Sequence, residues 1–459
     1  MRKSLWTLAI VTSVLAVPMA HAADPQVDEL KAQLQQALKT IEDMQRRVET
    51  LERQQQAQQP APAAAQAPAG APAGAPAGAL VIAPRSVADE NAPDKDKAHV
   101  EFYGQVMIDA IYDAKRMNPQ WAATLRPSQI PVNCPGDAGC GKDGATTFSV
   151  RQSSLGFKSF IPTTYGQIKT DVSFDLFGSD GGTHVHWLNV WGELGAFGVG
   201  QYYSNFMDID VFPNTIDYWG PSGMMFLRNP QLRYTPLDRD GMKVALSLEA
   251  PNSAIDTGKL TQVDPAFGTG IQPWNRTPDA IASFRLEGDW GHARAAGMVR
   301  EVGYQFVNTP GANPSGHKTG YGVNLSGAFK FFGGKDSMTW QAAYGHAIAS
   351  YANDGGVDLA PGATLRAETV PSAAWLLYYN HAWSAQWSSA IGYSEHRQSN
   401  TDGQFGSAFH KGSYASANVL FYPTKNITTG LEYLWGRREN KDGASEPDSR
   451  LQFSTKVTF

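Results

Sequence analysis

The chain has 459 residues, with 38 Lys and Arg against 43 Asp and Glu, so its formal net charge is −5. Mean hydropathy is −0.34, and aromatic residues make up 11% of the chain. These values exclude a polytopic helical membrane protein, which needs apolar runs of about 18 residues or more, and a basic nucleic-acid-binding protein. They leave a large secreted β protein or a transmembrane β-barrel.

The N-terminus has the parts of a secretory signal peptide. Arg2 and Lys3 are basic, residues 5–17 form an apolar run too short to span a bilayer, and Ala20-His21-Ala22 offers small residues for cleavage. We therefore predict a signal peptide over 1–22, with an uncleaved anchor as the alternative. Export of a bacterial protein follows. Because an exported protein meets an oxidising environment, the two cysteines, Cys134 and Cys140, are predicted to form a disulfide rather than to bind a metal.

Residues 23–59 carry a heptad pattern. Apolar side chains step by three and four along the segment, at Val27, Leu30, Leu34, Ala37, Ile41, Met44, Val48 and Leu51. This stripe predicts a coiled coil through which copies of the chain associate. A single amphipathic helix lying on another surface is the alternative. Residues 60–98 are rich in Ala, Pro and Gly, which is typical of a semi-extended linker.

From residue 99 to residue 459 the chain alternates apolar and polar side chains in segments of about ten residues. In the last segment Leu451, Phe453 and Val457 share one face, whereas Gln452 and Lys456 share the other. Sixteen such segments are predicted. Their centres lie near Met107, Leu155, Val172, Asn189, Val199, Gln231, Leu246, Phe284, Gly297, Leu325, Ala343, Leu377, Ala390, Asn418, Leu431 and Phe453.

The connections between these segments alternate in length. Long ones are expected at 116–147, 204–223, 251–276, 308–317, 352–371, 398–410 and 438–448, with a short exception near 178–183. The intervening turns are tight. Long loops at one end and short turns at the other are typical of an outer-membrane barrel and have no reason to occur in a sandwich. We therefore predict an all-β protein, a sixteen-stranded antiparallel transmembrane β-barrel over 99–459, with the helix on the periplasmic side.

Several motifs resemble those of known porins. FYG at 102–104, RQSSLGFK at 151–158 and VWGELG at 190–195 resemble the opening strands of general porins, and Phe459 ends an alternating strand as in other outer-membrane barrels. NFMDIDVFPN at 205–214 and IDYWGP at 216–221 are similar to the DcaP-type porins. This resemblance implies a homotrimer of barrels in the outer membrane of a Gram-negative bacterium, in contact with lipid and lipopolysaccharide. It also implies small anionic solutes such as dicarboxylates.

Strand parity predicts which charged side chains face the lumen. Basic candidates exceed acidic ones, which favours anions. Arginine suits carboxylates because its guanidinium group forms two parallel hydrogen bonds. The expected solute-contacting residues are Arg228, Arg233, Arg285, Arg294, Arg300, Lys158 and Lys169. Loop 204–223 occupies the position of a constriction loop, so its acids Asp208, Asp210 and Asp217 either form one wall of a transverse field or cap turns and bind loop backbone.

A passive channel is the leading interpretation. A structural tether between outer membrane and cell wall is an alternative, and an outer-membrane hydrolase is a weaker one, because no histidine lies in a recognisable nucleophile motif. No enzymatic activity, cofactor, metal or nucleic-acid partner is expected.

Overall fold

The computed structural model describes residues 98–137, 139–307 and 315–459. The chain divides into two units, Met1–Pro72 and Ala73–Phe459, and all described residues belong to the second. The predicted signal peptide, the heptad segment and the linker up to residue 97 lie outside the described residues. Within those residues, no helix is both long enough and apolar enough to cross a membrane.

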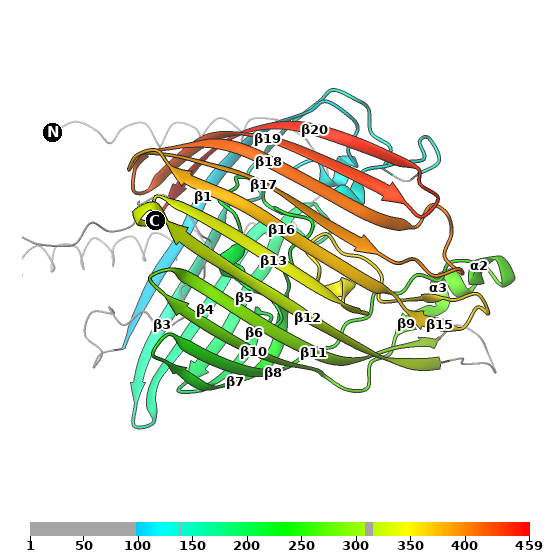
Figure 1. The fold of residues 1–459 in the computed structure, drawn as a ribbon, viewed down its shortest axis with the longest axis horizontal. Helices are drawn as coiled ribbons and strands as arrows, with labels where there is room; N and C mark the ends of the chain where they lie inside the picture. The colour runs from blue at the N-terminus through cyan, green and yellow to red at the C-terminus, as the bar shows by residue number, and fades with distance from the viewer. Residues whose placement is uncertain (1–97, 138, 308–314) are drawn as a thin grey trace, which may run out of the picture. The chain divides into compact units, whose positions relative to one another are not determined.

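One antiparallel sheet of eighteen strands makes up the barrel wall (Figure 1). Two of them, β2 and β9, only extend the pairing of β1 and β11, so sixteen strands form the wall itself, as predicted. The sixteen are β1 (His99–Asp113), β3 (Ser154–Thr163), β4 (Gly166–Phe177), β5 (Thr183–Leu194), β6 (Phe197–Tyr203), β7 (Arg228–Arg239), β8 (Met242–Glu249), β10 (Asp279–Gly288), β11 (Gly291–Phe306), β12 (Ser315–Phe331), β13 (Asp336–His346), β16 (Pro371–Ala382), β17 (Trp387–Gln398), β18 (Phe409–Thr424), β19 (Ile427–Asn440) and β20 (Ser445–Thr458).

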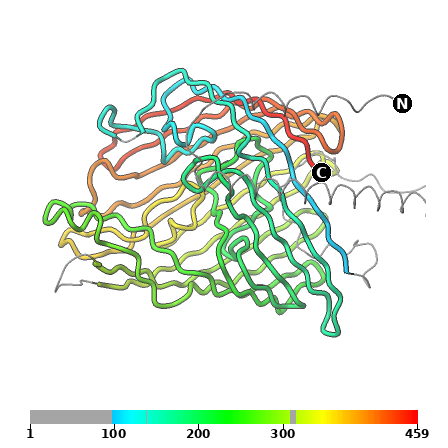
Figure 2. The backbone as a smooth tube through the Cα atoms, turned by 180° about the vertical axis from the view of Figure 1, so that it is seen from behind, coloured from blue at the N-terminus to red at the C-terminus, as the bar shows by residue number. Residues whose placement is uncertain are grey.

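Each wall strand pairs with its neighbours in the chain, and the pairing of β1 with β20 closes the barrel. Gly104 and Phe459 exchange two backbone hydrogen bonds of 3.1 Å at this seam. Figure 2 shows the blue first strand beside the red last strand. Closure leaves no unpaired strand edge in the wall, which is what an apolar surrounding demands of backbone N–H and C=O groups.

Short turns and long loops lie at opposite ends of the barrel (Figure 1). In the turn between β7 and β8, Asp240 and Gly241 have φ values of 54° and 73°. Two positive values define the type I′ turn that suits twisted antiparallel strands. One prediction was wrong: the connection expected at 438–448 is only 441–444, because β19 and β20 extend beyond the apolar band.

The long loops carry the remaining elements. They are β2 (Ala145–Ser149), β9 (Ile271–Pro273), β14 (Leu359–Pro361), β15 (Ala367–Thr369), α2 (Leu260–Val263), α3 (Phe267–Gly270) and the 3-10 turns η1 (Pro119–Trp121), η2 (Pro127–Gln129), η3 (Ile209–Val211) and η5 (Ala349–Tyr351). One further 3-10 turn, η4 (Phe332–Gly334), lies in a short connection. Cys134 and Cys140, in the loop after β1, are joined by a disulfide.

The two faces of the wall differ as the alternation predicts. On β20, Leu451 and Phe453 are exposed on the outer face, whereas Gln452 and Ser454 are buried on the inner face. Large exposed apolar side chains recur on the outer face of β3 and of every wall strand from β5 to β8. An apolar exterior around a polar interior is the arrangement of a barrel that sits in lipid.

Candidate functional site

The loop between β6 and β7, residues 204–227, folds into the barrel and is called the inner loop below. Its backbone carbonyls accept hydrogen bonds from wall side chains on several strands: Phe206 from Asn324 Nδ2 at 2.8 Å and Gly223 from Gln341 Nε2 at 3.2 Å. Ile216 accepts one from Gln452 Nε2 at 2.8 Å. Because these donors lie on β12, β13 and β20, the inner loop crosses the lumen and narrows it.

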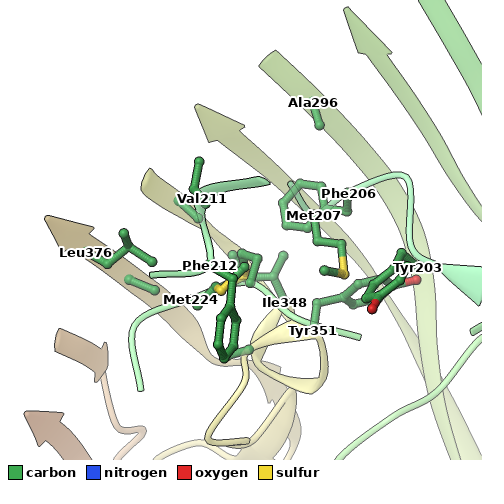
Figure 3. Packing of buried hydrophobic residues seen from close by; sticks show 14 of the residues in the cluster. Tyr203, Phe206, Met207, Val211, Phe212, Met224, Ala296, Ile348, Tyr351 and Leu376 are labelled. Carbon is green, nitrogen blue, oxygen red and sulfur yellow. The ribbon is translucent and has the colours of Figure 1, made fainter. Parts of the chain in front are cut away.

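An apolar cluster holds one side of the inner loop. Phe206, Met207 and Phe212 pack with Ile348 and Tyr351 from the loop between β13 and β16 (Figure 3). Phe206 and Ile348 are completely buried. Burial of this kind contributes about 1.5–3 kcal/mol for each large apolar side chain. The constriction is therefore a packed structure rather than a free segment.

Asp208 fastens the inner loop to the wall by its side chain. It caps η3 and accepts hydrogen bonds from His292 Nε2 at 2.8 Å and from Ser326 Oγ at 2.7 Å. Arg285 lies 3.4 Å away. Burial alone would raise the pKa of this carboxyl group, but the hydrogen bond from His292 and the charges of His292, Arg294 and Arg285 hold the pKa below its ordinary value. Asp208 therefore remains ionised.

Asp210 is the acid of the inner loop that reaches the open lumen. Its side chain is 29% exposed and lies 2.6 Å from Arg285. Asp208, Asp210 and His292 are close enough to hold a metal ion, but both carboxylates already pair with the Arg285 guanidinium, and Asp208 also accepts from His292. The geometry therefore fits an ion pair between the inner loop and β10, and we assign no metal to it.

Asp217 follows the other expectation for the loop acids. Its carboxylate is buried and accepts hydrogen bonds from Thr124 Oγ1 at 2.8 Å, from the Leu125 backbone N–H at 3.1 Å and from Tyr414 at 3.1 Å. Burial raises its pKa, although Arg450 and these hydrogen bonds oppose the rise. Asp217 binds loop backbone and does not face the lumen.

Arg228, Arg233 and Arg294 stand near the inner loop without acidic partners. Arg228 donates to Asn189 at 3.2 Å and lies over the Tyr203 ring. Arg233 donates to Gln231 at 2.8 Å and to the Tyr203 carbonyl. Arg294 donates to the carbonyls of Met207 at 2.5 Å and Asn205 at 2.9 Å. Within the described part of the chain, none of the three forms an ion pair with a carboxylate, although the charge of Arg294 acts on the nearby Asp208.

Arg300 does not fit the expected role in solute contact. Its side chain is completely buried and lies 3.1 Å from Asp279 and 3.7 Å from Asp358. It also donates to the Ala347 carbonyl at 2.9 Å. Parity placed Arg300 on the correct face, but the loop between β13 and β16 covers it. Its role is to anchor that loop.

Replacing Arg300 with methionine is expected to destabilise the barrel by about 3–5 kcal/mol, because a buried carboxylate loses its partner. The loss of stability is measured as the temperature at which the fast-migrating band of the folded barrel disappears from detergent gels. The matched control is Arg276→Gln, which breaks an exposed pair with Glu301 at 2.6 Å. An R300M barrel as stable as R276Q would contradict the anchoring role.

Lys158 and Lys169 lie on the inner face at the short-turn side of the inner loop. Lys158 Nζ is 5.4 Å from the centre of the Tyr103 ring, and Lys169 is directly opposite Glu193 in the register of β4 and β5. Both lysines are half-buried. The two lysines therefore add positive charge to the lumen on the short-turn side of the constriction.

Sequence reasoning missed the residues that hold the inner loop from the long-loop side. Arg126 lies between the rings of Trp121 and Trp219, 4.2 Å from each ring centre, and pairs with Asp354 at 3.2 Å. Burial raises the pKa of Asp354 against the opposing charge of Arg126. These contacts join three loops far apart in the chain, so no local pattern indicates them.

A closed sixteen-stranded barrel with a polar lumen and an inward-folded loop is the fold of porin-type outer-membrane channels. Residues 77–260 match the family model described as DcaP outer membrane protein, which confirms the resemblance expected from the sequence. The outer membrane channel DcaP of Acinetobacter baumannii has the same fold, with 22% identity and a TM-score of 0.68 over 80% of this chain and 99% of that chain.

Two other solved barrels are more distant. An anion-selective porin from Comamonas acidovorans is 10% identical, with a TM-score of 0.51 over 79% of this chain and 100% of that chain. OmpT of Vibrio cholerae is 12% identical, with a TM-score of 0.49 over 80% of this chain and 99% of that chain. No curated protein matches the chain in sequence.

Proposed function

We propose that this outer-membrane channel is passive and prefers small hydrophilic anions such as dicarboxylates. The observation that carries the proposal is the set of three arginines, Arg228, Arg233 and Arg294, that border the inner loop without a described acidic partner. A narrow lumen inside a low-dielectric barrel wall focuses their field and raises the local concentration of anions. Guanidinium groups on β7 and β11 suit a solute that carries a carboxylate at each end.

Asp210 limits this preference without reversing it. It is paired with Arg285, whose guanidinium also contacts Asp208 at 3.4 Å and Glu287 at 2.8 Å. Arg285 is thus surrounded by acids and contributes little free positive charge. The selectivity of the pore therefore rests on the three unpaired arginines rather than on Arg285 or Arg300.

We expect the full-length protein in planar bilayers to give a reversal potential of anionic sign under a KCl gradient. A short dicarboxylate added on the long-loop side should reduce KCl current in a concentration-dependent way, because it competes with chloride at the arginines. A monocarboxylate of the same length is the control and should block less. Cation selectivity, or equal block by both acids, would contradict the proposal.

We further propose that three barrels associate and that the heptad segment over 23–59 reinforces the trimer on the periplasmic side. The resemblance to DcaP-type porins and the apolar stripe support this assembly. Crosslinking of the full chain should give a trimer. Leu34→Ser together with Ile41→Ser should weaken the trimer without changing single-channel conductance, whereas a lost conductance would favour a role of that segment in the channel itself.

A further inference from the structure

The outer face of the wall has a furrow along β18. The small residues Ala415 and Ala417 of β18 form its floor. Tyr393 on β17 and Tyr433 on β19 flank them, and the hollow extends to Trp375, Leu377 and Tyr379 on β16. The furrow has a volume of about 660 Å³. Tyr433 is 51% exposed on this face. A groove with an alanine floor and aromatic sides offers a lipid chain more contact area than the flat neighbouring surface does.

Basic side chains lie around the end of this furrow that is closer to the long loops. Ala415 on β18 lies opposite Tyr393 on β17 and Trp435 on β19. Two residues closer to the long loops, Ser413 on β18 lies opposite Arg437 on β19. Another two residues on, Arg397 is opposite Lys411. Outward side chains recur every second residue, so all three cations lie on the outer face directly beyond the aromatic band.

The acids at this end leave both arginines available. The outward carboxylates are Glu439, which pairs with Lys411 at 3.1 Å, and Glu395, which accepts from the Tyr393 hydroxyl at 3.3 Å. Arg437 donates to Ser445 Oγ at 2.7 Å. Among the described residues, neither Arg397 nor Arg437 forms an ion pair. Two unpaired guanidinium groups therefore flank the mouth of an apolar furrow.

A second hollow in the outer wall is apolar but does not end at unpaired cations. It has a volume of about 1140 Å³ and is lined by apolar side chains such as Leu232, Val299 and Val323. Beyond Val299 on the same face comes Glu301, which pairs with Arg276 at 2.6 Å. The larger hollow thus ends at a neutralised carboxylate and lacks the free cations of the β18 furrow.

We propose that the β18 furrow binds a phosphorylated glycolipid of the outer leaflet, with an acyl chain on Ala415 and Ala417 and a phosphate between Arg397 and Arg437. Long loops face the cell exterior in such barrels, so these arginines lie at the depth of the outer-leaflet headgroups. Arginine binds phosphate through two parallel hydrogen bonds, and basic clusters beside apolar surfaces recognise anionic lipid headgroups.

The test is native mass spectrometry of the full-length protein in detergent, titrated with bis-phosphorylated lipid A. Wild type should retain lipid A, and R397Q/R437Q should bind it at least tenfold more weakly. R276Q, at the other hollow, is the matched control and should bind as wild type does. R397K/R437K keeps the charge but loses the two-pronged geometry, and should restore part of the binding.

The furrow itself is tested by A415L/A417L, which fills its floor and should weaken lipid A binding while leaving single-channel conductance unchanged. Conductance also reports that each variant is folded, because all four positions face outward. Equal binding by R397Q/R437Q and R276Q would overturn the proposal. Equal retention of dephosphorylated lipid A, or of phosphatidylethanolamine, would overturn it as well, since either result shows a furrow that does not select the phosphate.

Discussion

Replacing Arg228 and Arg233 with glutamine is expected to remove most of the anion preference that we propose for the channel. Each guanidinium acts on a permeating ion at a few Å, where one unit charge in water is worth about 1 kcal/mol, or about fivefold in relative permeability. Each charge attracts anions and also repels cations, so the two together should change the anion-to-cation permeability ratio by at least about 25-fold. Reversal potentials of the single and double variants under a KCl gradient measure this change.

The control for this experiment keeps the charge and alters the geometry. R228K/R233K should retain the selectivity for chloride but lose affinity for the dicarboxylate, because lysine cannot form two parallel hydrogen bonds to one carboxylate. Arg294 is left intact in these variants, since its hydrogen bonds to Met207 and Asn205 hold the inner loop. Wild-type reversal potentials in R228Q/R233Q would place the selecting charges elsewhere.

Replacing Asp208 with alanine is expected to release the inner loop. The substitution removes the acceptor for His292 and Ser326 and leaves Arg285 with fewer partners in a buried site. Breaking a buried charged network of this kind costs about 3–5 kcal/mol. Single-channel records should show frequent transitions between conductance levels, because the first part of the loop is no longer fixed to β11 and β12.

Asp210→Asn is the matched control for D208A, since it removes one partly exposed partner of Arg285 and leaves the attachment to the wall intact. It should alter selectivity slightly and produce no new conductance levels.

The pH dependence of conductance is a second readout of the role of Asp208. A carboxyl group whose pKa is lowered in the folded protein contributes stability above its ordinary pKa and loses it only in stronger acid. Wild-type conductance should therefore remain steady at mildly acidic pH, and a steady D208A channel would contradict the role of Asp208.

The wall of the barrel could be predicted from the sequence because its determinants are local. Period-two alternation reports the face of each side chain, and turn residues such as Asp240 and Gly241 mark the ends. All sixteen predicted strand centres fall within wall strands. The sequence did not indicate that β19 continues past residue 438 or that β20 begins before residue 448. Strands that leave the apolar band no longer need apolar side chains, so the alternation ends there.

The candidate site could be predicted only in part. Parity places Arg233, Arg294 and Arg300 on the inner face, but it reveals neither depth nor partners. Whether an inward arginine meets solute depends on loops that fold back from distant parts of the chain, as the carbonyls of Asn252 and Ala347 do on Arg300. The contact of His292 with Asp208 could not be predicted either, because the two residues lie 84 positions apart in the chain.

The seam between β1 and β20 has a consequence for biogenesis. Arg450 on β20 binds Asp113 on β1 at 2.6 Å across 337 positions of sequence. Every other wall contact can form between neighbouring strands as the chain emerges, but β1 keeps an unpaired edge until the last strand has been delivered. Such an edge pairs readily with foreign strands. We therefore expect assembly of this barrel to depend on an escort that shields β1 until β20 arrives, and a chain interrupted before β20 should become a substrate for periplasmic proteases.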